Sequence, residues 1–88
     1  RDVGLEARRI MSAPDEFARL VQTALQMQQA GRLDEADAAL NEALRLDPGS
    51  DETWVLLAQV RRRAGRAELA IAALHRAIQL APSRADYH

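Results

Sequence analysis

The chain has 88 residues, a formal net charge of −1 and no cysteine. This length fits one small domain, and the lack of cysteine excludes disulfides, zinc–thiolate sites and thiol chemistry. A nearly neutral chain has no overall field that would draw it to nucleic acid or to an anionic membrane.

The composition favours helices, because alanine and leucine dominate while aromatic and β-branched residues are few. No apolar run approaches the ~20 residues of a membrane span, and the N-terminus lacks a signal pattern. A cytoplasmic location is therefore predicted by default. Because the chain begins with Arg1, we expect it to be a piece of a longer polypeptide.

The first segment, 1–16, has a weaker pattern than the rest of the chain. It is predicted to be a capping helix or the end of a degenerate repeat, with a loosely ordered linker as the alternative. The apolar residues that would share one helical face are Val3, Ala7, Ile10 and Met11.

A helix is predicted over about 15–29, because apolar side chains there recur at helical spacing. Gly31 would end it, since glycine takes a left-handed turn at no steric cost. A second helix is predicted over 33–46. Asp34 and Glu35 at its start complement the positive end of the helix dipole.

The segment "DPGSD" at 47–51 is predicted to end the second helix. Ser50 or Asp51 would then be the N-cap of a third helix over 51–63. After a second glycine turn, a fourth helix is predicted over 67–80.

Landmarks in the chain repeat every 34 residues. The only three prolines, Pro14, Pro48 and Pro82, follow this spacing. A fixed period of this length is typical of stacked helical repeats. Further pairs at the same spacing are Gly31 and Gly65, Ala36 and Ala70, Leu40 and Leu74, Ala43 and Ala77, and Leu46 and Leu80.

The pattern resembles the tetratricopeptide repeat family, whose 34-residue helix–turn–helix unit carries the motif W-x2-L-G-x2-Y…A-x3-F…P. Arg61 departs from it, because an aromatic residue is usual there. We expect its aliphatic stem to cover the position while the guanidinium reaches water. In 51–84 the matching residues are Trp54, Leu57, Ala58, Gly65, Ala70, Leu74, Ala77 and Pro82; in 17–50 they are Leu20, Thr23, Ala24, Met27, Ala36, Leu40, Ala43 and Pro48.

The resemblance implies an all-α fold in which antiparallel helix–turn–helix units stack into a right-handed α-solenoid with a concave inner face. Ala36 and Ala70 are expected where the two helices of a unit approach closely, while Leu40 and Leu74 fill the space between units. The predicted organisation is an N-terminal capping helix or degenerate repeat end over 1–16, a first repeat over 17–50, a second repeat over 51–84, and the start of a truncated third repeat over 85–88.

No combination of residues in the sequence predicts catalysis, a metal site or a cofactor. His75 and His88 lack a second ligand at metal-binding spacing. Serines beside the prolines suit capping and turn roles, and the isolated glycines exclude a phosphate loop. We therefore expect these 88 residues to be non-catalytic.

By the resemblance, the first helix of each unit lines a groove that binds a peptide or helix of a partner protein. Members that hold the C-terminal carboxylate of chaperones use a Lys and Asn clamp. Val21 and Leu25 at the first clamp positions, in a chain without Lys, disfavour that ligand. The predicted groove residues are Ala18, Val21, Gln22, Leu25, Gln28, Gln29, Glu52, Val55, Leu56, Gln59, Arg62 and Arg63.

The segment "RRRAGR" at 61–66 is the main charge cluster, and repeat 51–84 has six arginines against three acidic residues. One interpretation is a solvated helix end whose arginines complement the dipole. The other is an anchor for an acidic peptide, because guanidinium groups bind carboxylates in a bidentate manner. Nucleic acid is disfavoured, because no aromatic platform accompanies the arginines.

The sequence thus predicts a non-catalytic protein–protein interaction module. The alternative is the N-terminal segment of a larger bacterial enzyme, of glycosyltransferase, sulfotransferase or hydroxylase type, which positions a protein substrate or mediates oligomerisation.

Self-association is also predicted, because the residues after Leu80 are too few for a capping helix. Two C-terminal ends would pair about a two-fold axis, or a terminal helix would be exchanged between chains. The apolar edge involved would consist of Ile71, Leu74 and Ile78 with parts of Trp54 and Leu57.

Overall fold

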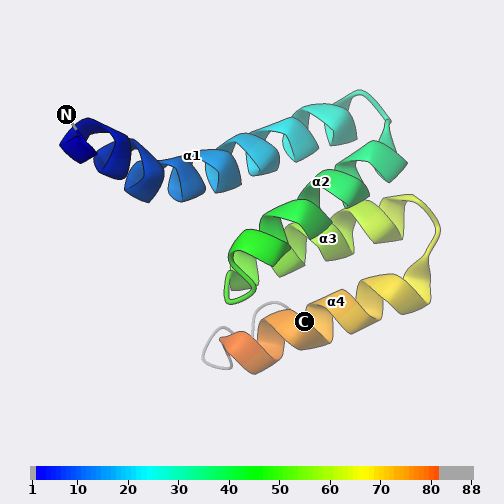
Figure 1. Ribbon diagram of the computed structural model, residues 1–88. Coiled ribbons are helices and arrows are strands. Elements are labelled where there is room, and N and C mark those ends of the chain that lie inside the picture. Colours follow the sequence, from blue (N-terminus) through cyan, green and yellow to red (C-terminus); the bar gives the residue numbers. More distant parts are fainter. Residues whose placement is uncertain (1, 82–88) are drawn as a thin grey trace.

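The computed structural model describes the backbone of residues 2–81 and the side chains of residues 15–81. This part of the chain consists of helices joined by short turns, and consecutive helices run antiparallel (Figure 1). The arrangement confirms the predicted all-α helical-repeat solenoid. The helices are α1 (Asp2–Gln29), α2 (Leu33–Leu46), α3 (Asp51–Arg63) and α4 (Ala67–Leu80).

Helix α1 begins much earlier than the predicted start at about residue 15. It runs without a break from Asp2 through Pro14, so residues 2–16 have helical backbone and not that of a linker. Proline has no N–H for the carbonyl four residues earlier, which weakens a helix locally and favours a bend. Figure 1 shows α1 bending in its blue N-terminal part. The capping or degenerate-repeat role of 1–16 stays a prediction.

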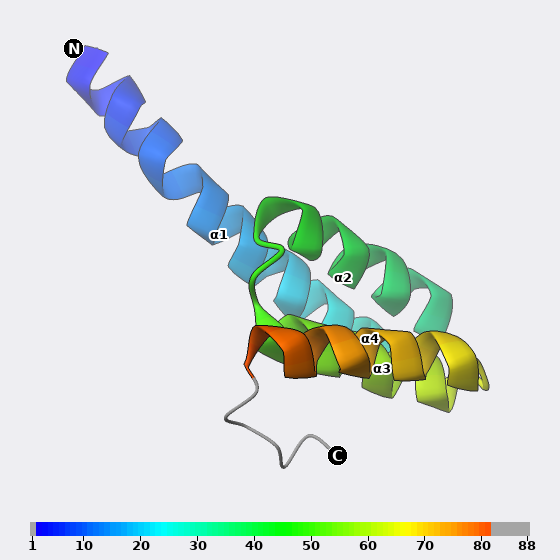
Figure 2. The same ribbon diagram turned by 90° about the horizontal axis from the view of Figure 1, so that it is seen from below.

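The N-terminal part of α1 extends away from the other helices, as Figure 2 shows. The C-terminal part of α1 instead packs against α2. The segment 85–88, which was predicted to begin a third repeat, lies outside the described residues.

Both turns within the helical pairs have the same geometry, as the shared glycines predicted. Gly31 has φ 80° and Gly65 has φ 79°, in the left-handed region that glycine enters without a steric penalty. The N–H of Arg32 donates to the carbonyl of Met27 at 2.8 Å, so the turn satisfies an end-of-helix carbonyl. Each pair therefore closes by the same local mechanism.

Ser50, of the two N-cap candidates, caps α3. Its Oγ accepts a hydrogen bond from the backbone N–H of Thr53 at 3.4 Å and lies 2.8 Å from the Thr53 hydroxyl oxygen. The indole Nε1 of Trp54 donates to the carbonyl of Pro48 at 3.0 Å. These bonds hold the connection between the two helical pairs in one conformation.

The core is built from small and aliphatic residues of all four helices. Leu40 is 0% exposed and lies in the same buried cluster as residues of α3, which matches its expected position between units. Leu57 is also 0% exposed. Its predicted place on an open apolar edge is therefore wrong, because α3 turns it into the core. The buried cluster comprises Ala24, Ala36, Leu40, Leu44, Leu57, Ala58, Val60 and Ala73.

Candidate functional site

The described residues contain no group of three histidine, cysteine, aspartate or glutamate side chains placed to hold a metal ion. His75 is exposed on α4, as predicted, and His88 lies outside the described residues. None of the helices in this part of the chain is long and apolar enough to cross a membrane.

The predicted groove residues form two rows that differ in exposure. In α1, Val21, Leu25 and Gln28 are half-buried. In α3, the positions 34 residues later are Val55, Gln59 and Arg62, of which the last two are exposed. The other predicted residues are exposed at Ala18, Gln22, Gln29, Glu52 and Arg63, while Leu56 is half-buried and packs against the core.

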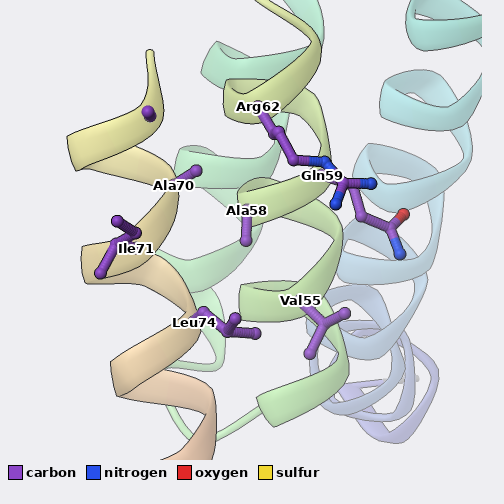
Figure 3. Close-up of a pocket in the computed structure, with 8 residues that line it drawn as sticks. Val55, Ala58, Gln59, Arg62, Ala70, Ile71 and Leu74 are labelled. Carbon is purple, nitrogen blue, oxygen red and sulfur yellow. The ribbon is translucent and has the colours of Figure 1, made fainter. Parts of the chain in front are cut away.

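Three of the predicted α3 residues come together in a pocket of about 370 Å³ between α3 and α4. Figure 3 shows Ala58 and Leu74 beside the space between the two helices, Gln59 and Arg62 along α3, and Ile71 on α4. The α1 row does not contribute to this pocket. Its lining residues, called here the α3/α4 edge, are Val55, Ala58, Gln59, Arg62, Ala67, Ala70, Ile71 and Leu74.

The α3/α4 edge is the repeat-equivalent of the surface on which α3 packs. Ala36 is 0% exposed, whereas Ala70, 34 residues later, is 7% exposed and lines the pocket. Leu40 is fully buried and its equivalent Leu74 only partly so. The residues 34 positions before the edge are Val21, Ala24, Leu25, Gln28, Leu33, Ala36, Asp37 and Leu40. Ala70 is thus buried between α3 and α4, as expected, but at the margin of an open surface.

Arg61 does not send its guanidinium to water, so this part of the sequence interpretation is wrong. Its Nε donates to Oδ2 of Asp37 at 3.0 Å, and the two side chains are only 15% and 14% exposed. Its Nη1 also donates to the carbonyl of Leu69 at 3.3 Å. The departure from the family motif therefore has a partner on α2.

Two further arginines of the cluster connect the second unit to the first. Nη2 of Arg66 lies 2.6 Å from Oδ1 of Asp34, and Nη1 of Arg63 donates to the carbonyl of Gln28 at 3.1 Å. The side chain of Arg62 makes no ion pair or hydrogen bond to the described part of the chain. The cluster therefore divides into three inter-unit contacts and one available guanidinium.

A signal for these contacts was present in the sequence. Consecutive antiparallel helices bring the first turn of α2 beside the last turn of α3. Asp34 lies in the first turn of α2 and Asp37 follows in the next, whereas Arg61 and Arg66 flank the end of α3. Sequence patterns alone do not determine which side of each helix faces the other, so the pairing requires the tertiary arrangement.

Comparison with curated proteins found no match. A protein-family profile described as tetratricopeptide repeat matches residues 27–88, which is more than half of the chain. The match includes α2, α3 and α4 with both glycine turns. Together with the 34-residue period and the stacked antiparallel helices, it shows that the chain belongs to the tetratricopeptide repeat family.

Proposed function

We propose that the chain is a protein–protein interaction module that binds a peptide or helix of a partner along α1 and α3. Family membership supports the general role. The observation that carries the specific proposal is the surface of α3, where half-buried Val55 lies beside exposed Gln59 and Arg62. Protein-binding surfaces combine apolar contact area with polar groups that fix orientation.

An acidic residue in the partner is favoured by Arg62. Arg61, Arg63 and Arg66 already bond within the chain, whereas the Arg62 guanidinium is exposed and has no partner in the described residues. Its planar donors suit a carboxylate. Arg62 is therefore expected to contribute more to recognition than Arg63.

The test is a selection of random displayed peptides on the immobilised 88-residue chain, followed by fluorescence anisotropy with the enriched peptides. We expect acidic residues to be enriched. Arg62→Glu should weaken binding at least about tenfold, which corresponds to about 1.4 kcal/mol. Binding should also weaken as salt is added, because an exposed charge pair is screened.

The matched control is Arg76→Glu, which makes the same charge change on the exposed face of α4. Arg76 bonds only to Gln79 among the described residues and does not line the pocket. Peptides that bind both variants equally well would contradict a role for the α3 surface. A selection that enriches no peptide would contradict peptide binding by this chain.

A further inference from the structure

The residues of a helix that would fit the α3/α4 edge can be inferred from a contact within the chain. Each of its residues lies 34 positions after a residue of the α1/α2 surface. Helix α3 packs on that earlier surface, with Leu57 fully buried. The contacts of α3 therefore show how a helix binds to a surface of this shape.

The two surfaces differ at one position that decides which helix fits. Asp37 on the first surface pairs with Arg61 of α3, but its equivalent on the second surface is Ile71, which is 55% exposed. An arginine opposite Ile71 would lose water without gaining an acceptor, which is unfavourable. An apolar residue there would remove Ile71 from water instead.

The surfaces agree at a second position. Asp34 pairs with Arg66, and the equivalent of Asp34 is Glu68, an exposed carboxylate that makes no ion pair or hydrogen bond to the described residues. A helix on the α3/α4 edge should therefore have an apolar residue at the position of Arg61. It should have a basic residue at the position of Arg66.

Helix α1 and the turn after it have this combination. Met27 stands where α3 has Arg61, and Arg32 stands where the following turn has Arg66. The only ion pair of Arg32 within the described residues is with Glu35 at 3.5 Å, with both side chains at least 60% exposed. Such a surface pair contributes little and exchanges readily. Leu20 continues the apolar positions, standing where α3 has Trp54.

We propose that the α3/α4 edge binds α1 of a second copy of this chain, so that copies associate head to tail. Met27 of one copy would contact Ile71 of the next, and Arg32 would pair with Glu68. Within a chain the corresponding contacts are Arg61–Asp37 and Arg66–Asp34. Mixed combinations, arginine against Ile71 or methionine against Asp37, are the unfavourable ones.

This association is heterologous, so it differs from the two-fold pairing that the sequence alone predicted. A head-to-tail contact does not close on itself, and the assemblies should lengthen with concentration. It should be weaker than the contact within the chain, because Thr23 stands where α3 has the buried Leu57. The inference does not rest on the proposed peptide binding, which is tested by another assay.

The experiment is sedimentation velocity on the 88-residue chain over a concentration series. The wild-type weight-average mass should rise above the 9.7 kDa of one chain. Ile71→Asp and Met27→Arg should each remain monomeric, because each blocks one half of the contact. An equimolar mixture of the two should associate again, because Met27 of the Ile71→Asp variant can contact Ile71 of the Met27→Arg variant and the two introduced charges are opposite in sign.

The double variant Met27→Arg/Ile71→Asp should self-associate again, because it recreates the arginine–aspartate pair seen within the chain. Ala72→Asp, an exposed position of α4 outside the pocket lining, is the control and should behave as wild type. Circular dichroism checks that each variant is folded. If Met27→Arg unfolds, Glu68→Arg at an exposed position replaces it as a variant that weakens association.

Three results would overturn the proposal. A wild-type chain of constant monomer mass would show that the edge does not bind a second copy. Loss of association in Ile71→Asp but not in Met27→Arg would indicate two-fold pairing of α3/α4 edges. Failure of the double variant to associate while it remains folded would show that Met27 and Ile71 are not in contact.

Discussion

The ion pair between Arg61 and Asp37 allows a direct test of how the two units are joined. The perturbation is a double-mutant cycle of Asp37→Ile, Arg61→Met and the variant that combines them. Each single change leaves one charge without its main partner between α2 and α3. The combined change replaces the pair by two apolar side chains of the kinds found at Ile71 and Met27.

The expected loss of stability follows from the burial of the Arg61–Asp37 pair. With side-chain exposures of 15% and 14%, the pair is mostly removed from water. Loss of one partner of a buried pair costs 3–5 kcal/mol, but residual exposure and remaining hydrogen bonds reduce this to about 2 kcal/mol for each single change. Asp37 keeps a bond from Asn41 at 2.7 Å, and Arg61 keeps the carbonyl of Leu69 at 3.3 Å.

Because apolar replacement of a buried pair is often neutral, the combined variant should lie within about 1 kcal/mol of wild type. The coupling energy would then be about 3 kcal/mol. Urea denaturation followed by circular dichroism measures it, at concentrations where the chain is monomeric. A chain of this length is expected to have about 4–13 kcal/mol of stability, so the single variants should remain measurable. Additive losses in the combined variant would refute the argument that this pair is desolvated and coupled.

Two further predictions concern packing and capping. Ala36→Leu should destabilise the chain by about 1–3 kcal/mol, because Ala36 is fully buried under α3. Ala70→Leu should cost less, since its side chain would extend into the open pocket. Equal urea midpoints for the two variants would contradict the repeat-equivalence of these surfaces. Ser50→Ala should lower the free energy of unfolding by about 1 kcal/mol through loss of the α3 N-cap. Ser50→Asp should retain most of the wild-type stability, because aspartate also caps helices. An unchanged urea midpoint in Ser50→Ala would show that the Thr53 N–H is satisfied by other means.

Local signals in the sequence determined where most helices begin and end. Gly31 and Gly65 mark left-handed turns, and Ser50 marks a helix start, because these effects act within a few residues of the chain. The 34-residue period then determined the fold class, since a unit that repeats in sequence repeats in structure. Pro14 was the exception, because a single missing hydrogen bond did not end α1.

The rotation of each helix about its axis and its offset from its neighbours were decided only by the tertiary structure. These quantities determine that Leu57 enters the core, that Arg61 reaches Asp37, and that Arg62 alone of its cluster stays available in the described residues. Sequence spacing states which residues share a face of one helix, but not which residue of another helix lies opposite. The predicted groove therefore stays a prediction. The pocket between α3 and α4, with its open apolar margin at Ile71, became visible only when the helices were packed together.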